Sequence, residues 1–375
     1  MNILYVGRFT TPKDAASLRV FGIAKALSEK GHNVEFLCKE EYSQTDITEN
    51  GFRYRYVFNK KEGKPALFYE WCTGSRTAEI ISKLTERSSV DAVILYNATI
   101  IETKKILSIC KRRNILLYSD TTEWYEIGHG KNLLVSLYAL LVIARIRCCD
   151  KKLDGVIAIS DYLNNYYQKR NIKSIKIPPL FCYEPQNAAA NGNDMPTLLY
   201  AGNPGTKDEL NIIIESVTDI NSRESKVKLV FIGTPKPKNH QKLSEHNIVF
   251  LPKCSNEEII ERLKKADFTF LFRRDATFAK AGYSTKLAES LYNGVPVLCN
   301  SIGGADLDIK DGYNGIKIKD LSADAIKKAL NRALDLTDTG FKELKEHSAE
   351  FGKNNYYYKN YSDKLSRFFI GCEDN

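Results

Sequence analysis

The sequence predicts an α/β protein with two Rossmann-like, doubly wound domains in tandem. Short apolar runs alternate with segments of helical period in both halves of the chain, which is typical of parallel sheets covered by helices. The 375 residues, 43% hydrophobic and 27% charged, are enough for two cores. The run PQNAAANGND at 185–194 has the composition of a linker. We therefore expect domains over residues 1–185 and 192–350, and a C-terminal helix over 351–375 that returns to the first domain.

The first half contains five apolar runs that indicate strands. In chain order they are NILYVG, NVEFLC, DAVILY, ILLYSD and GVIAIS, which begin at residues 2, 33, 91, 115 and 155. An amphipathic helix is expected over 15–30, and Gly31 ends it.

The second half repeats this alternation. Strands are expected at TLLYAG, KLVFIG, IVFLPK, FTFLFR and VPVLCN, and helices over 208–217, 256–266, 285–293 and 323–334. The aromatic tail over 354–372 also has a helical pattern. Ligands of doubly wound sheets bind outside the carboxyl ends of the strands, so we expect the two domains to face a common cleft.

Composition and charge exclude several classes of protein. No run reaches the roughly 18 apolar residues of a membrane span, and no signal peptide is recognised, so we expect a cytoplasmic protein. The nine cysteines are scattered without paired C-x-x-C spacing, which favours neither a disulfide framework nor a zinc site. Nearly all of the net charge of +9 lies in the first 185 residues, which favours a phosphorylated substrate or an anionic membrane surface. No nucleic-acid-binding motif accompanies it, and no G-x-G-x-x-G follows the first strand as in an NAD dehydrogenase.

Residues 281–300, AGYSTKLAESLYNGVPVLCN, carry the most specific pattern in the chain. Ser284 and Thr285 open a helix, and such hydroxyls cap the first amide groups. Lys286 lies in the first turn, where the free amides and the helix dipole attract phosphate. Glu289 shares that face about 4.5 Å further along the axis, near the separation of a diphosphate from its ribose. The pattern indicates a nucleotide-diphosphate site, and the alternative is a capped helix with a solvated Lys and Glu.

The chain resembles the GT-B-fold glycosyltransferases, and among them the retaining family 4 type that builds bacterial surface polysaccharides. The resemblance rests on GIAKALSEKGHNVEFLC, GVIAISDYL, YAGNPGTKDEL and, most specifically, AGYSTKLAESLYNGVPVL followed by DGYNGIKI. It implies transfer of a hexose from a nucleotide-diphosphate donor, expected to be a UDP-sugar, to a hydroxyl of a glycan or polyprenyl-linked acceptor. It also implies retention without a metal or cofactor, because positive groups stabilise the leaving diphosphate, which helps to deprotonate the acceptor.

By this resemblance the second domain supplies most of the donor site. Lys286, Lys207 and Arg273 are expected to act on the diphosphate, and Glu289 on the ribose. Further donor contacts are expected from Gly202, Asn203, Gly205, Arg274, Ala281, Gly282, Tyr283, Ser284, Thr285, Leu287, Ala16 and Ser17.

The sequence departs from the family pattern at two positions of that site. Ala281 stands eight residues before Glu289, where the family has a Glu that contacts the donor sugar, so the sugar is left open. Asn203 stands where the phosphate-binding loop of the family has an Arg after its first glycine. Arg273 or Arg274, at the end of the FTFLF strand, is expected to supply the missing charge.

The first domain is expected to bind the acceptor. The run SDTTEWYEIGHG follows a predicted strand and carries Asp120, Glu123 and His129, and Arg19 comes from the first helix. Clustered acids and a histidine at a strand end are typical of substrate contacts. The alternatives are acids that cap helices and an arginine on a helix surface.

Residues 131–149, KNLLVSLYALLVIARIRCC, are strongly apolar with basic ends. We expect a buried helix that leads to the GVIAIS strand. The alternative is a segment that rests on an anionic bilayer, which would make the protein peripheral at the inner face of the membrane.

Two other functions stay open. Nucleotide-sugar 2-epimerases have a similar two-domain architecture. The loss of the family Glu at Ala281 also suits a non-catalytic subunit that binds a sugar nucleotide.

Overall fold

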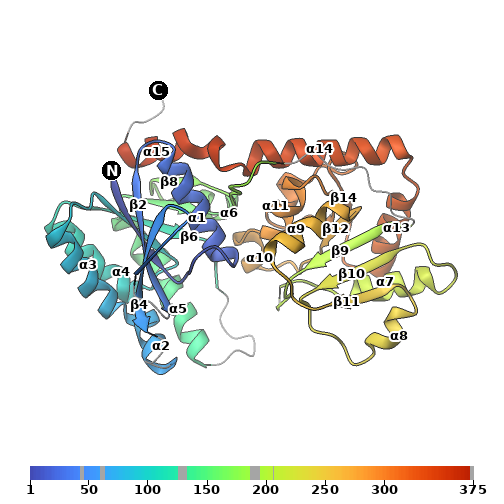
Figure 1. Cartoon of the computed structure of the whole chain (residues 1–375), viewed down its shortest axis with the longest axis horizontal. Coiled ribbons are helices and arrows are strands. Elements are labelled where there is room, and N and C mark those ends of the chain that lie inside the picture. The colour runs from blue at the N-terminus through green and yellow to red at the C-terminus, as the bar shows by residue number, and fades with distance from the viewer. Residues whose placement is uncertain (43–45, 60–63, 126–132, 186–194, 206, 372–375) are drawn as a thin grey trace. The chain divides into compact units, whose positions relative to one another are not determined.

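The computed structural model describes residues 1–42, 46–59, 64–125, 133–185, 195–205 and 207–371. The chain divides into two compact units (Figure 1). The first comprises Met1–Cys182, Ala281–Tyr283 and the residues from Tyr358 onward, and the second comprises Tyr183–Lys280 and Ser284–Tyr357. The fold is the predicted α/β arrangement of two parallel sheets, one in each unit.

The first unit is built on a sheet whose described strands pair in the order β3-β4-β2-β1-β5-β6-β7-β8. Neighbours are parallel except β3 and β4, which form an antiparallel pair at one edge. The central strands are buried on both faces, which explains their continuous apolar sequences. The strands are β1 (Asn2–Gly7), β2 (Asn33–Tyr42), β3 (Asp46–Glu49), β4 (Phe52–Asn59), β5 (Ala92–Tyr96), β6 (Leu116–Thr121), β7 (Gly155–Ala158) and β8 (Ser174–Lys176).

Helices of this unit pack in layers on the sheet. The first helix begins after Asp14, whose carboxylate accepts a hydrogen bond from the Ser17 amide, and it buries an apolar stripe that includes Val20, Ile23 and Leu27. Helix α4 belongs to another layer than α1, and it lies between α3 and α5. The helices are α1 (Ala15–Ser28), α2 (Lys64–Thr73), α3 (Ser75–Arg87), α4 (Ile100–Arg112), α5 (Leu133–Cys148) and α6 (Asp161–Gln168), with a short 3-10 turn η1 (Asp150–Lys152).

The C-terminal tail from Tyr358 onward belongs to the first unit. It is not one continuous helix, because Tyr357 is extended between α14 (Asp338–Tyr356) and the final segments η2 (Tyr358–Tyr361) and α15 (Ser362–Ile370). The last helix packs on α1 and on β6. There the Phe369 and Tyr118 rings lie 4.3 Å apart between centroids.

The second unit is built on a parallel sheet whose described strands pair in the order β11-β10-β9-β12-β13-β14. Its core includes aromatic side chains from three neighbouring strands: Tyr200, Phe231 and Phe270. The strands are β9 (Thr197–Ala201), β10 (Lys228–Ile232), β11 (Ile248–Leu251), β12 (Phe268–Leu271), β13 (Val297–Asn300) and β14 (Gly315–Ile318). The helices before α14 are α7 (Asn211–Asn221), α8 (His240–Ser244), α9 (Asn256–Lys265), α10 (Thr277–Ala281), α11 (Thr285–Tyr292), α12 (Gly304–Asp308) and α13 (Ala323–Leu334).

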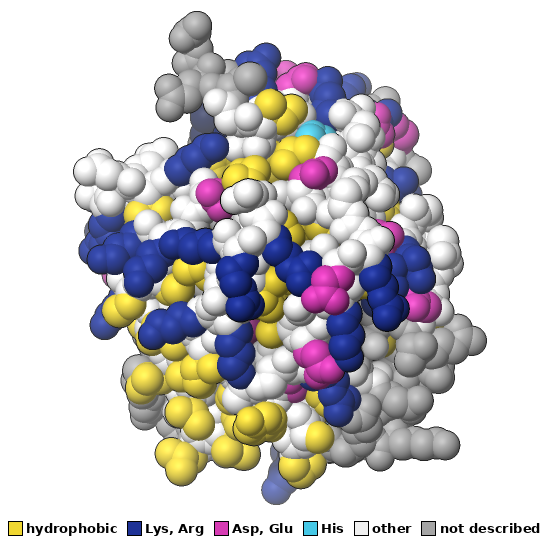
Figure 2. Space-filling model, turned by 90° about the vertical axis from the view of Figure 1, so that its left-hand side faces the viewer, with side chains coloured by type: hydrophobic (Ala, Val, Ile, Leu, Met, Phe, Trp, Pro, Cys, Tyr) yellow, Lys and Arg dark blue, Asp and Glu magenta, His cyan; other side chains and the backbone are white. Residues whose placement is uncertain are grey.

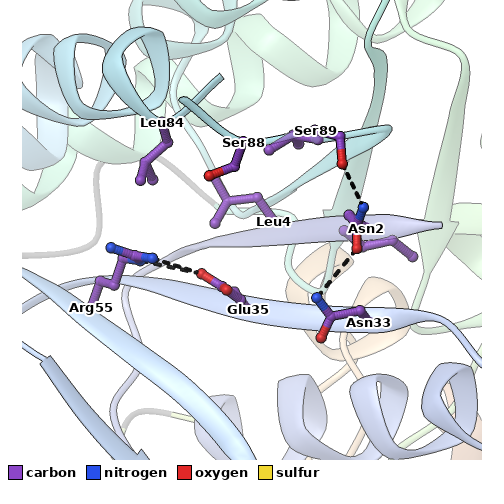
Figure 3. Close-up of a pocket in the computed structure, with 10 residues that line it drawn as sticks. Asn2, Leu4, Asn33, Glu35, Arg55, Leu84, Ser88 and Ser89 are labelled. Atoms are coloured by element: carbon purple, nitrogen blue, oxygen red, sulfur yellow. Dashed lines mark hydrogen bonds and ion pairs between the residues drawn. The ribbon is translucent and has the colours of Figure 1, made fainter. Parts of the chain in front are cut away.

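A cavity of about 180 Å³ opens in the first unit at the amino ends of β1 and β2 (Figure 3). Its polar side chains bind one another: Arg55 pairs with Glu35 at 3.1 Å, and Asn2 Nδ2 donates to the Ser89 hydroxyl at 2.9 Å. Ligands of doubly wound sheets bind at the carboxyl ends of the strands, so this cavity is not the candidate site.

Candidate functional site

The candidate site lies within the second unit, at the carboxyl ends of β9 and β12 and the start of α11. Ser284 is the N-cap of α11, and its hydroxyl accepts a hydrogen bond from the Leu287 amide at 3.3 Å. Of the two hydroxyl residues expected to open the helix, Ser284 is the cap. Lys286 follows in the first helical turn.

Asp208 joins the cationic groups of the site. Its Oδ1 accepts from Arg273 Nε at 2.8 Å, and its Oδ2 accepts from Lys286 Nζ at 3.0 Å and from the Tyr200 hydroxyl at 2.6 Å. The Asp208 side chain is 2% exposed, Arg273 11% and Lys286 27%. The carboxylate therefore holds two positive charges in fixed positions beneath a partly open surface.

The charges of this cluster depend on one another. Burial alone would raise the pKa of Asp208, but Arg273 and Lys286 hold that pKa below its ordinary value. Burial lowers the pKa of Lys286, and Asp208 offsets part of that effect. The interaction with Asp208 therefore favours the charged form of Lys286.

A glycine loop approaches Lys286 closely. Gly202 has φ of +114°, and a Cβ there would lie 3.3 Å from Lys286 Cε, so a larger residue would be strained and would crowd the lysine. Asn203, at the position of the family Arg, accepts a hydrogen bond from the Gly205 amide at 2.9 Å and thus shapes the loop. Lys207 ends the loop partly buried and close enough to lower the pKa of Lys286.

The two neighbouring arginines differ in position. The backbone of Arg273 is fixed by Asn300, whose Oδ1 accepts from the Arg273 amide at 2.9 Å and whose Nδ2 donates to its carbonyl at 2.7 Å. Arg274 is 74% exposed and pairs with Glu209. Of the two candidates for the missing charge, the geometry favours Arg273.

Sequence reasoning missed Asp208, Tyr200 and Asn300. Asp208 and Glu209 were expected to begin a helix, but α7 begins only at Asn211, because the backbone of Asp208 bridges to that of Arg273. Tyr200 and Asn300 lie at the carboxyl ends of β9 and β13, and Asp208 lies in the loop that follows β9. That position was the available signal.

Glu289 lies one turn after Lys286 and lines the same small cavity. It is partly buried, and burial raises its pKa to about 7, although the charge of Lys286 acts to lower it. With a pKa of about 7, the Glu289 carboxyl group gains and loses its proton near neutral pH.

In the first unit, Asp120 and Arg19 are not acceptor contacts in this structure. They form a buried salt bridge at 2.7 Å, with side chains 0% and 2% exposed. Asp120 also accepts from the Tyr5 hydroxyl at 2.5 Å, and Arg19 donates to the Ile177 carbonyl at 2.8 Å. Because their polar atoms are engaged inside the unit, the expectation that they touch the acceptor is corrected.

The remaining predicted residues of the first unit differ in how far they are exposed. Ser17 is buried, accepts from the Thr10 amide at 3.2 Å and donates to Asp14 at 2.8 Å, so its hydroxyl shapes the loop before α1. Ala16 and Glu123 are partly exposed. The prediction for His129 lies outside the described residues.

Ala281, Gly282 and Tyr283 pack with the first unit. Ala281 has no exposed surface, and its carbonyl accepts from the Ser160 hydroxyl at 2.6 Å. Its methyl group is part of an apolar cluster with α5 and α6, which Tyr283 also joins. Since Ala281 and Gly282 are buried, the expected side-chain contact of Ala281 with a donor is not supported.

Both the sequence and the fold of the chain are similar to those of known proteins. The family model described as glycosyl transferases group 1 matches residues 185–356. An uncharacterized glycosyltransferase of Methanocaldococcus jannaschii is 23% identical over 236 residues, which cover 58% of this chain. The chain spans 59% of the length of that relative.

The matched range, residues 185–356, is less than half of the chain. The site around Lys286 lies inside this range. No described helix of the chain is long and apolar enough to cross a membrane.

Solved structures extend the likeness in fold to both units of the chain. Sucrose-phosphate synthase from Thermosynechococcus elongatus has a TM-score of 0.75 at 13% identity, over 99% of this chain and 98% of that one. HepE of Anabaena, in complex with UDP and glucose, has a TM-score of 0.66 at 12% identity, over 99% of each chain. The GT-B fold predicted from the sequence is confirmed.

The raised pKa of Glu289 makes the stability of the second unit depend on pH. Between the ordinary pKa of about 4.5 and the folded value of about 7, the folded state holds a proton that the unfolded state releases. Stability therefore falls as pH rises through this window, and the cost is fully present above pH 7. Glu289→Gln is expected to stabilise the second unit by about 2 kcal/mol at pH 8, allowing for partial exposure, and hardly at pH 5.

Scanning calorimetry at both pH values measures this difference. Glu343→Gln, which changes an exposed acid on α14 of the same unit, is the matched control and is expected to have a similar small effect at both. An equal gain for Glu289→Gln at pH 5 and pH 8 would contradict a titrating Glu289.

Proposed function

We propose that the protein transfers a hexose from a UDP-sugar to a hydroxyl of a glycan or polyprenyl-linked acceptor. The transfer retains anomeric configuration and uses neither a metal nor another cofactor. The proposed setting is the cytoplasmic assembly of a surface polysaccharide. The observation that carries the proposal is the convergence of Lys286 and Arg273 on one carboxylate beside a glycine loop and the start of α11.

In this proposal the donor diphosphate binds where the two cations are already held together. Its oxygens approach Lys286 and Arg273 from the open side, with Lys207 and the loop from Gly202 to Gly205 beside them. The amides in the first turn of α11 add partial positive charge. Glu289, one turn further, accepts from the ribose hydroxyls in its charged form.

The cations that bind the diphosphate also lower the barrier of the transfer reaction. As the bond from the anomeric carbon to the diphosphate oxygen breaks, negative charge accumulates on the diphosphate. The acceptor oxygen forms its bond on the same face, and its proton passes to a diphosphate oxygen. Asp208 fixes the cations before the reaction begins. They therefore stabilise the diphosphate more strongly in the transition state, where its negative charge is larger, than in the bound donor.

The comparisons support a nucleotide-sugar donor at a coarser level. Structures of HepE from Anabaena hold UDP with glucose, or UDP-glucose. These ligands belong to that protein, and the present chain leaves its sugar open because Ala281 replaces the Glu of the family pattern.

The two arginines at the end of β12 provide a paired test. Arg273→Ala is expected to weaken UDP binding about tenfold, because it removes a charge-assisted hydrogen bond next to the diphosphate. Arg274→Ala, one residue away and 74% exposed, is expected to change it less than about twofold. Titration calorimetry with UDP measures both, and equal effects of the two variants would contradict the role of Arg273.

A binding and product screen tests the proposed function itself. The protein is titrated with UDP, GDP, dTDP and CMP and then incubated with the matching nucleotide sugars and candidate acceptors. A glycoside formed together with free nucleotide supports the transferase. Free nucleotide without transfer to any acceptor favours the epimerase, and absence of nucleotide binding favours the non-catalytic subunit.

A further inference from the structure

Helix α5 of the first unit exposes a row of large apolar side chains. Leu133, Leu137 and Leu140 recur at spacings of four and three residues, so they share one face. They are 83%, 47% and 48% exposed. A contiguous apolar patch that is exposed to solvent is typical of a surface that binds a protein or a membrane.

The opposite face of α5 is fixed in the core, so the exposed row is not the result of a detached helix. Tyr138, Val142 and Ile146 are buried in an apolar cluster with β7 and α6. The guanidinium of Arg145 has no exposed surface and binds Asp150 at 3.2 Å. The sequence therefore predicted a buried helix correctly for one face only, and the leucines of the other face lie in a fixed orientation.

The neighbouring helix α4 supplies exposed positive charge. It packs against α5, and its exposed side chains include Lys104, Lys105, Lys111 and Arg112. The acid within α4, Glu102, is buried and paired with Lys39 at 2.7 Å, and α5 contains no acid. Figure 2 shows hydrophobic side chains gathered on this side of the molecule next to a band of Lys and Arg.

We propose that the α4–α5 face, defined by Leu133, Leu137, Leu140, Lys104 and Lys111, docks on the surface of an anionic lipid bilayer. The leucines enter the boundary between headgroups and acyl chains, as the apolar side of an interfacial helix does. Each Lys or Arg held near the anionic surface adds attraction. A second copy of this chain fits less well, because two-fold contact through this face would bring its basic groups close to one another.

The inference extends the proposed function, since it places the first unit where a lipid-linked acceptor is presented. It is testable without donor or acceptor, so a failure here leaves the transfer reaction standing. The probe is flotation of the full chain with vesicles of phosphatidylcholine containing one third phosphatidylglycerol, compared with pure phosphatidylcholine. The wild type is expected to float with the anionic vesicles and to be released at high salt.

Two double variants test the two parts of the face. Leu133→Glu with Leu137→Glu is expected to lower partition to anionic vesicles at least about tenfold, because apolar burial is lost and like charge is added. Lys104→Glu with Lys111→Glu is expected to remove the preference for anionic vesicles. Leu307→Glu, a leucine 59% exposed on α12 of the second unit, is the matched control and should float like the wild type.

Folding of each variant is checked by the fluorescence of Trp71 and Trp124, both of which lie in the first unit. If the leucine variant does not fold, the lysine variant decides on its own, because its substitutions are exposed. Absence of wild-type flotation overturns the proposal, and so does unchanged flotation of both folded double variants. A leucine variant that changes the oligomeric state but not flotation also overturns it and assigns the face to a second copy.

Discussion

Replacing Lys286 with alanine is expected to lower the turnover of sugar transfer about 100-fold or more. The ammonium lies 3.0 Å from Asp208 at the start of α11, where we place the leaving diphosphate. Charge on that group is larger in the transition state than in the bound donor, so the loss should appear mainly in kcat. Steady-state kinetics at saturating donor and acceptor measures it.

The fold should survive this change, because Asp208 keeps its hydrogen bonds from Arg273 and Tyr200. Lys286→Arg, which retains the charge with different geometry, should recover part of the rate. Lys280→Ala, an exposed lysine on α10 that pairs with Asp275, is the matched control and should turn over like the wild type. A folded Lys286→Ala enzyme with normal kcat and a higher KM would mean that the lysine binds donor without stabilising the transition state.

Most of the fold follows from continuous apolar runs in the sequence. Each strand expected from such a run is present, and the helix predicted over 323–334 has the bounds of α13. The strand β4, FRYRYVFN, was not predicted. Its Phe52, Tyr54 and Tyr56 are buried and alternate with arginines, so its signal is a period of two. Short strands such as β8, with three residues, carry too few side chains for any period to be recognised.

The donor side of the candidate site was predictable in part because its residues lie within one helix. The spacing of Lys286 and Glu289 is fixed by helical geometry alone. Asp208 is 78 residues from Lys286 and 65 from Arg273, and only the order of strands β9, β12 and β13 brings them together. A single sequence states which residues end strands, but not which strand ends are neighbours.

The acceptor side was predicted less well, because exposure at a strand end is not encoded in the residue type. Asp120 was expected to contact the acceptor at the end of a strand, but β6 continues to Thr121 and Asp120 lies inside the sheet. Its partner Arg19 is 101 residues away and was likewise expected to contact the acceptor. Opposite charges that pair in the interior are indistinguishable from substrate-binding charges until the pairing is known.

Asp120→Ala is therefore expected to destabilise the first unit by about 3 to 5 kcal/mol, the largest stability effect that we predict. The change leaves the Arg19 guanidinium, 2% exposed, without its counter-ion, and an uncompensated buried charge is costly. Urea unfolding followed by tryptophan fluorescence measures it, because both tryptophans lie in this unit. Asp46→Ala breaks an Asp–Arg pair in the same unit whose side chains are each 46% exposed, and it should cost less than about 1 kcal/mol.

Adding Arg19→Met to Asp120→Ala separates burial of an unpaired charge from loss of packing. An apolar side chain of similar length needs no counter-ion, so the double variant should recover part of the stability lost in Asp120→Ala. If Asp120→Ala alone costs less than about 1 kcal/mol, water reaches the pair in solution. Asp120 would then return as a candidate acceptor contact, because the argument against that role rests on its burial.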